Sequence, residues 1–261
     1  MRVPASQTYR YLSSRSVRLT TTSLSPLTRP ITKRTAPVAS LPQPILQTRQ
    51  VTSSASKMSS DSFLEAVKSR RTYYALSSES PVSDKKIHEI VDTAVTDVPS
   101  SFNSQSTRVV VLLNEDHKKL WGDIVSPIIK SVAPPEAWPS SEQKLNGFKA
   151  AYGTILFYEE PKDVAKLQEQ YPLYADKFPQ WSEHTNAMHQ IVLWTALEKE
   201  GFGANLQHYN PLIDEKIAST WNVPQNWSLK AQLVFGKPVA DPYPKTFKPL
   251  EERVFIHGAK E

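Results

Sequence analysis

The spacing of apolar residues from Asp61 onward predicts helices alternating with strands. Two or three apolar residues per turn mark the helices, and β-branched runs such as RVVVLL at 108–113 mark the strands. Three prolines at 134, 135 and 139 predict a loop over 132–141. The expected helices span 61–70, 83–98, 115–130, 164–170 and 183–200, and the expected strands span 108–113, 153–158, 204–208 and 229–235.

Two of the helices carry clear boundary signals. Ser83 is suited to cap the second helix at its N-terminus, and Pro99 stops that helix. The helix over 183–200 is apolar on nearly all sides, which is typical of a central helix, and Gly201 suits its left-handed C-terminal cap.

Two other segments have no regular pattern. The aromatic-rich stretch 171–181 either packs locally or forms the rim of a substrate pocket. The tail after Gly236 has four prolines and a final apolar run, Val254-Phe255-Ile256, so we expect an extended C-terminal arm that wraps a partner subunit.

The N-terminal extension differs in composition from the rest of the chain. Residues 1–60 hold nine Lys/Arg, 21 Ser/Thr and no Asp or Glu. We interpret residues 1–57 as a disordered extension and a mitochondrial transit peptide; the alternative is a plain disordered tail. Met58 could start a shorter form, which we would expect in the cytoplasm or nucleus. Residues 58–261 then form one domain.

Removal of the extension reverses the net charge. The whole chain is +5, but residues 58–261 hold 22 Lys/Arg against 26 Asp/Glu, a net charge of −4. A nucleic-acid-binding function, the third class considered, therefore rests on the extension alone. No apolar stretch approaches the roughly 20 residues of a membrane span. The chain has no cysteine, which excludes disulfides, thiolate nucleophiles and cysteine-ligated metals.

Several kinds of catalytic site lack their motifs. The spacing of His184 and His189 does not suit two ligands on one helix face, so we expect no metal site. No G-x-S-x-G is present, and GFG at 201–203 lacks the third glycine of a dinucleotide fingerprint. Redox or group-transfer chemistry would therefore need a bound organic cofactor.

Two short segments offer groups that could bind such a cofactor. Arg70 and Arg71 can grip a phosphate, and Thr72 adds a hydroxyl. About thirty residues later, Asn103 and Gln105 present amides that suit the polar edge of a flavin ring. The alternatives are a solvated helix end and an ordinary polar turn.

The order of these motifs resembles the FMN-dependent nitroreductase family. The resemblance rests on SRRT at 69–72, PSSFNSQ at 99–105, LEKEGFGANLQHYN at 197–210 and LVFGKP at 233–238, and it covers residues 61–255. The combination PSSFNSQ and LQHYN is similar to the fungal branch. The resemblance implies an α+β nitroreductase-like fold, with a mixed central sheet flanked by helices.

The same resemblance implies a set of FMN-binding positions. Arg70, Arg71 and Thr72 would contact the phosphate and ribityl chain, with Lys245 or Lys248 as a second anchor. Ser101, Asn103 and Gln105 would lie along the ribityl chain and ring, and Gln207 and His208 near its redox edge. His208 is the one candidate proton donor; the alternative is a structural histidine or a contact through the backbone alone.

Two positions depart from the family pattern. Tyr74 stands where many members have Lys or Arg near N1 of the flavin, and Phe247 stands where an arginine is common. Losing these cations would weaken phosphate binding or lower the potential of the flavin.

The implied function is an NAD(P)H-dependent oxidoreductase. It would be a homodimer with a flavin at each subunit interface, and would pass hydride through FMN to nitroaromatic, quinone or similar acceptors. The alternative function is a flavin- or lipid-binding regulatory module, active in stress responses with little turnover.

Overall fold

The computed structural model describes residues 59–260. The predictions for the transit peptide and for a start at Met58 fall outside this range. Helix α1 (Asp61–Ser69) leads to the short strand β1 (Leu76–Ser77) and to α2 (Asp84–Asp97). The remaining elements follow in the order η1 (Ser101–Asn103), β2 (Thr107–Leu113), α3 (Asn114–Lys119), η2 (Leu120–Val125), α4 (Ser126–Val132), α5 (Trp138–Lys149), β3 (Gly153–Glu159), α6 (Pro161–Gln170), η3 (Pro172–Tyr174), α7 (Phe178–Lys199), β4 (Gly203–Gln207), α8 (Asp214–Trp221), β5 (Ser228–Pro238) and η4 (Leu250–Glu252).

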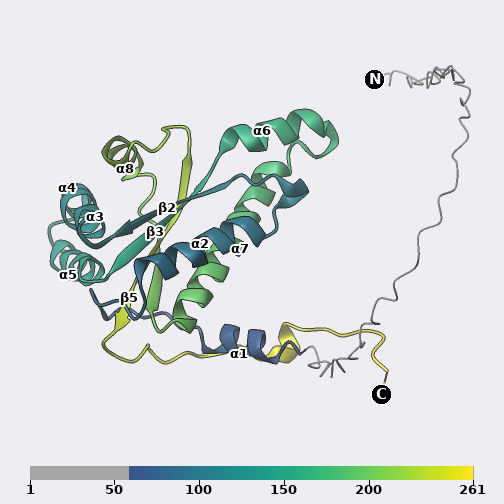
Figure 1. Ribbon diagram of the computed structural model, residues 1–261, viewed down its shortest axis with the longest axis horizontal. Coiled ribbons are helices and arrows are strands. Elements are labelled where there is room, and N and C mark those ends of the chain that lie inside the picture. The colour runs from purple at the N-terminus through teal and green to yellow at the C-terminus, as the bar shows by residue number, and fades with distance from the viewer. Residues whose placement is uncertain (1–58, 261) are drawn as a thin grey trace, which may run out of the picture. The chain divides into compact units, whose positions relative to one another are not determined.

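A five-stranded sheet forms the centre of the fold (Figure 1). Strand β3 lies between β2 and β5, and β5 also pairs with β4 and β1. All of these pairings are antiparallel, and among residues 59–260 parallel pairing is limited to the bridge between Thr72 and Ala204. The α+β class is thus confirmed, with the parallel component of the expected mixed sheet reduced to one residue pair.

Both faces of the sheet are buried under helices. Along β3, Ile155 and Phe157 pack under α2 and α7, whereas Leu156 and Tyr158 face Trp121 and Phe148 on the other side. Successive side chains of a strand point to opposite faces, so every residue of β3 is buried in one core or the other. Figure 1 shows α2 and α7 on one side of the sheet and α3, α4 and α5 together at one end of it.

The predicted boundary signals are confirmed. The Ser83 hydroxyl accepts a hydrogen bond from the Lys86 amide at 3.3 Å and caps α2. Gly201 adopts φ +91°, and the Phe202 amide bonds back to the Leu197 carbonyl at 3.2 Å, which closes the end of α7.

The predicted loop over 132–141 is wrong in its second half, because α5 begins at Trp138 with Pro139 in its first turn. A proline in the first helical turn loses no internal hydrogen bond, so it starts a helix as readily as it ends one. Pro161 likewise starts α6 before the predicted position, and Pro179 lies in the first turn of α7. Strand β1 and helix α8 were not predicted, and the helix expected over 115–130 contains a π-helical segment at η2.

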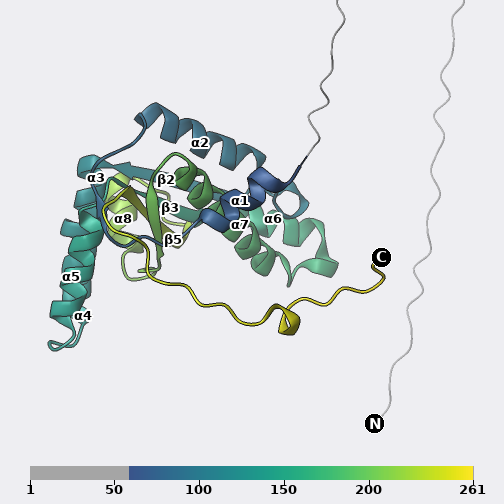
Figure 2. The ribbon, with the colours of Figure 1, turned by 90° about the horizontal axis from the view of Figure 1, so that it is seen from below.

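The predicted C-terminal arm is extended. Beyond Pro238 its only regular element among the described residues is η4, and Figure 2 shows the arm leaving the sheet and running away from the helices towards the C-terminus. Its apolar side chains are exposed; they are Val239, Tyr243, Phe247, Leu250, Val254, Phe255 and Ile256.

Candidate flavin site

The segment after α1 is held by two elements that follow much later in the chain. The Arg71 amide donates to both carboxylate oxygens of Glu198 in α7, at 2.9 and 3.2 Å. The Tyr73 amide bonds to the Ala204 carbonyl of β4 at 2.9 Å. At Gly203 a Cβ atom would lie 2.8 Å from the Tyr73 side chain, so only glycine allows this close approach.

The segment forms a cavity of about 380 Å³ together with the C-terminal arm. The Arg70 guanidinium lies over the Trp194 ring, 4.5 Å from its centroid, and the Arg71 guanidinium donates to the Tyr243 carbonyl. No carboxylate lines the cavity, which we call the cationic cavity. Its lining residues are Arg70, Arg71, Thr72, Tyr74, Tyr243, Pro244 and Lys245.

Glu198 lies beneath the two arginines. Burial raises the pKa of its carboxyl above the usual range, and the hydrogen bonds from the Arg71 amide and the Trp194 indole oppose that shift. The carboxylate is thus engaged by backbone and indole donors, which leaves the Arg70 guanidinium without a carboxylate partner within 4 Å among the described residues.

The arm contributes one of the two predicted lysines. Lys245 lines the cationic cavity, and its ammonium lies 5.1 Å from the Phe247 ring. Lys248 is exposed and is not among the lining residues. Phe247 is exposed to 76%, so the aromatic residue at this position does not fill the cavity.

A second cavity of about 470 Å³ shares Tyr74 and Tyr243 with the first. Sequence reasoning missed its other wall because that wall is α5, most of which went unassigned. Apart from Phe148, the α5 residues in this wall are polar or glycine, so the apolar periodicity that marks a helix in a sequence does not single them out. We call this space the α5 cavity; its walls are Tyr74, Ala75, Ser140, Gln143, Lys144, Gly147, Phe148 and Tyr243.

The end of β4 lies close to the α5 cavity. The Gln207 amide bonds to the Asn205 side chain at 2.8 Å, and His208 is exposed. The next residue, Tyr209, packs on Phe148 with ring centroids 6.4 Å apart. The predicted redox-edge residues and the predicted phosphate residues therefore flank one continuous region of the molecule.

The polar turn, defined as Ser100–Gln105, has a strained backbone. Phe102, Asn103 and Gln105 have positive φ values of 54°, 54° and 47°. Such conformations cost roughly 1 kcal/mol or more each outside glycine, so other contacts must hold them. The Ser100 hydroxyl accepts from the Gln105 amide at 2.9 Å, and the Ser101 amide lies 3.4 Å from the Thr185 hydroxyl of α7.

Buried Glu159 fixes the end of this turn. Its carboxylate accepts hydrogen bonds from the Ser106 and Thr107 hydroxyls, both at 2.6 Å, and from the Asn186 amide at 2.9 Å. These three donors come from the residue that follows the turn, from β2 and from α7, so one carboxylate ties the three segments together.

The aromatic stretch 171–181 packs against the turn. The Phe102 ring lies 4.8 Å from Tyr171, 5.3 Å from Phe178 and 6.0 Å from Trp181 between centroids. These contacts are local packing, the first of the two interpretations offered for this stretch. The residue that they hold in place, Phe102, belongs to the predicted flavin-binding turn.

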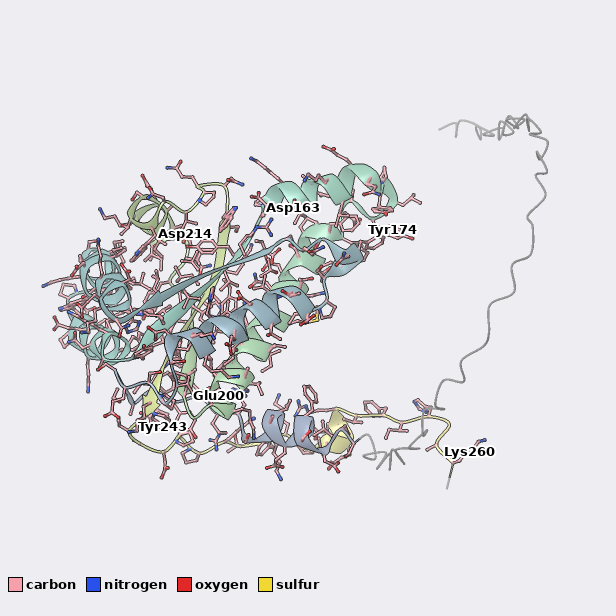
Figure 3. All side chains as sticks on the ribbon, in the orientation of Figure 1. Asp163, Tyr174, Glu200, Asp214, Tyr243 and Lys260 are labelled. Atoms are coloured by element: carbon pink, nitrogen blue, oxygen red, sulfur yellow. The ribbon has the colours of Figure 1, made fainter. Side chains whose placement is uncertain are left out.

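The structure does not bring the polar turn and the cationic cavity together within one chain. The turn contacts α7 at Thr185, and Arg71 contacts it at Glu198, about 20 Å further along the helix axis at 1.5 Å per residue. Gln105 lines a different cavity, of about 880 Å³, beside α2 and β2. In Figure 3, Tyr243 of the cationic cavity and Tyr174, which packs on Phe102, lie far apart.

Residues 59–260 lack two further features. No group of three or more His, Asp or Glu side chains is placed to hold a metal ion. No helix in that range is both long enough and apolar enough to cross a bilayer.

The chain has an α+β fold and a cationic cavity whose described lining residues include no carboxylate. These features make it a candidate phosphate- or nucleotide-binding protein. The profile of the nitroreductase family matches residues 67–237. The chain therefore belongs to the nitroreductase family, whose members are typically flavin-dependent oxidoreductases.

Individual relatives agree with this assignment. The nitroreductase-like protein HBN1 of Saccharomyces cerevisiae is 37% identical over 195 residues, 74% of this chain and 96% of HBN1. Nitroreductase CinD from Lactococcus lactis, solved with chloramphenicol and also with 4-nitrophenol, is 44% identical in the first of these structures. That structure has a TM-score of 0.69, with 75% of this chain and 99% of CinD covered.

A more distant neighbour shares the fold. A nitroreductase with bound FMN from Desulfitobacterium hafniense has a TM-score of 0.56 at 15% identity, with 74% of this chain and 97% of that chain covered.

Proposed function

We propose that this chain is an FMN-dependent oxidoreductase that uses NAD(P)H as electron donor. The observation that carries the proposal is the cationic cavity, in which two arginines, a lysine and a threonine hydroxyl converge without a carboxylate among them. Such a donor set fits a phosphate monoester, because guanidinium groups make charge-assisted hydrogen bonds to phosphate oxygens.

Different residues around the cavity would bind different parts of FMN. Arg70, Arg71 and Lys245 would hold the phosphate, and Thr72 would bind the phosphate or the ribityl chain. Gln207 and His208 would lie near the redox edge of the ring. When bound, FMN supplies two-electron redox chemistry that no side chain of this chain can provide.

A second copy of the chain would complete the site. The polar turn carries Ser101, Asn103 and Gln105, and it lies about 20 Å along α7 from the arginines of its own chain. We propose that the turn of one subunit faces the cationic cavity of the other. In such a homodimer, the turn of one subunit and the arginines of the other would meet on one nucleotide.

The exposed apolar surface supports such a dimer. Met188, Ile191 and Val192 of α7 are exposed to 38%, 41% and 39%, on the helix that the sequence predicted to be covered on nearly all sides. The arm adds a further set of exposed apolar residues, and β2 pairs on one side only among the described strands. We propose that the partner subunit covers these surfaces.

Nitroaromatic compounds and quinones are the proposed electron acceptors. CinD has been solved with chloramphenicol and with 4-nitrophenol, both of them nitroaromatic compounds, and this supports an acceptor of that class here. His208 is exposed at the end of β4, so its imidazole is accessible to solvent and to an acceptor bound there.

The experiment that tests the proposal is flavin analysis of the purified protein. We expect one FMN per chain and anaerobic bleaching of its visible absorption by NADH or NADPH, followed by reoxidation with 4-nitrophenol. A protein that contains FMN but is reduced by neither donor would favour the alternative, a flavin-binding module with little turnover. A protein without FMN would contradict the proposal.

We further propose that the N-terminal extension directs the chain to mitochondria. Its lack of acidic residues and its abundance of arginine and hydroxyl residues support this. N-terminal sequencing of the protein from fractionated cells tests it. A mitochondrial form cut before the folded domain is expected, and an intact N-terminus in the mitochondrial fraction would contradict cleavage.

A further inference from the structure

The α5 cavity adjoins the cationic cavity through a shared wall. Tyr74 and Tyr243 line both spaces, and their rings lie 5.8 Å apart. A ligand whose phosphate lies among Arg70, Arg71 and Lys245 can therefore extend past this tyrosine pair towards α5. On the proposed function, that extension is the ring system of FMN.

One face of α5 forms the far wall. Ser140, Gln143, Lys144 and Gly147 follow the i, i+3, i+4, i+7 spacing of a single helix face. Lys144 is the only charged side chain among the residues that line the α5 cavity. The wall that faces the tyrosine pair is therefore polar and carries one positive charge.

Gly147 keeps this wall open. A glycine inside a helix costs about 1 kcal/mol relative to alanine. At Gly203 a close neighbour explains the glycine, but a Cβ atom at Gly147 would meet nothing within 4 Å. Packing within the chain therefore does not require glycine here, and its missing side chain leaves room for a ligand.

Lys144 has no carboxylate to neutralise it. Among residues 59–260, no carboxylate oxygen lies within 4 Å of its ammonium group. Tyr74, on the opposite side, contributes a phenol and no cationic group. Among the described residues that line this cavity, the counter-charge for a negative charge that develops there comes from α5.

We propose that Lys144 is the cation that stabilises the negative charge of the reduced flavin ring. This inference rests on the proposed function. Hydride transfer from NAD(P)H, which becomes NAD(P)⁺, delivers two electrons and one proton to the ring. The reduced ring then carries one negative charge until a second proton binds. Lys144 acts on that charge from α5, in place of a cation at position 74.

The test compares the affinities for oxidised and reduced flavin. Lys144→Met removes the charge and keeps an unbranched side chain of similar length. We expect it to weaken binding of reduced FMN relative to oxidised FMN by about tenfold, which lowers the midpoint potential of the bound two-electron couple by about 30 mV. Lys119→Met is the matched control, because Lys119 is exposed and lies outside the cavity walls.

A second variant distinguishes the role of charge from damage to the fold. Adding Tyr74→Lys to Lys144→Met returns a cation to the same cavity, and we expect it to restore the potential. If Lys144→Met loses flavin altogether, restored binding in the double variant supports the inference and continued loss overturns it. An unchanged potential in flavin-loaded Lys144→Met also overturns it and leaves the proposed function intact, whereas a wild-type protein without FMN overturns both.

Discussion

The cationic cavity and the polar turn contact the same helix, α7, but are built in opposite ways. The cavity gathers fixed charges from the segment after α1 and from the arm, and the arm residues that complete it are exposed. The turn carries no charged residue, and buried Glu159 with the strand β2 holds its strained backbone in place. The cationic cavity is a positively charged surface suited to an anionic ligand, and the polar turn is a rigid, uncharged polar surface.

This difference suggests what each region contributes to a shared site. A rigid, pre-shaped polar surface can orient a ring without further loss of conformational entropy, and a charged cavity provides affinity through phosphate contacts. Because α7 holds them about 20 Å apart, each region would serve a different nucleotide in a dimer.

The largest expected effect comes from mixing two defective chains. Arg70→Ala/Arg71→Ala damages the cavity, and Asn103→Ala/Gln105→Ala damages the turn, so each homodimer should lose its FMN. A heterodimer of the two, isolated with two affinity tags, should bind one FMN per two chains, because one of its sites combines two intact halves.

Flavin absorbance of the purified heterodimer measures this result. The control is a dimer in which both chains carry the same defective substitutions and differ only in their affinity tags. If both halves of a site came from one chain, the mixed heterodimer would bind no flavin. That result would contradict the proposal that the cavity and the turn of one site belong to different subunits.

The next largest effect concerns the cavity alone. Arg70→Ala/Arg71→Ala should weaken FMN binding by more than about 100-fold, since a hydrogen bond to a charged group contributes roughly 1.5–3 kcal/mol. Equilibrium dialysis or fluorescence titration of the apoprotein measures it. Lys248→Ala, which removes a charge from the arm outside the cavity, should change the affinity little; equal losses in both would argue for diffuse charge attraction.

The polar turn can be weakened from beneath. Glu159→Ala removes the acceptor of the Ser106 and Thr107 hydroxyls and one of the two acceptors of the Asn186 amide, which should cost about 3 kcal/mol of stability and lower the Tm by roughly 6–12 °C. Differential scanning calorimetry measures the change. Exposed Glu169→Ala is the control, and a Tm for Glu159→Ala equal to that of the control would show that the turn holds its shape without the carboxylate.

The smallest effect concerns the support of α5. His117 is buried, and its ring nitrogens lie 2.9 Å from the Thr154 hydroxyl and the Phe148 carbonyl. Burial lowers the pKa of His117 to about 4. The unfolded chain therefore binds more protons between pH 6.5 and 4, and acid favours unfolding by about 2 kcal/mol at pH 5 relative to pH 8.

Urea unfolding of wild type and His117→Gln at both pH values isolates this contribution. The wild type should lose more stability than the variant on acidification, and His88→Gln, at an exposed position, should behave like the wild type. Burial raises the pKa values of Glu198 and Asp214, which adds stability in acid, so the difference between the proteins is the quantity to compare. Parallel pH dependences in wild type and His117→Gln would contradict the role of His117.

Local patterns in the sequence were sufficient for most of the fold. Strands β2 and β3 are rich in β-branched and aromatic residues, and the apolar residues of β5 are buried in both cores. Ser83 and Gly201 set helix boundaries through their own hydrogen-bonding and backbone preferences. The same local rules failed for proline, which is common both in loops and in the first turn of a helix. Prolines that begin α5, α6 and α7 also occur in loops, and only packing against the sheet selects the helix.

The sequence by itself determined which groups are available for chemistry: an arginine pair with a threonine, a polar turn, a lysine-bearing arm and no thiol. The tertiary structure decided which of them meet. It brought Lys245 to the arginines, left Lys248 outside, added the polar face of α5 and placed the turn at a distant point on α7. These outcomes depend on contacts between residues more than a hundred positions apart, such as Arg71 with Glu198, and the spacing of residues along the chain carries no record of such contacts.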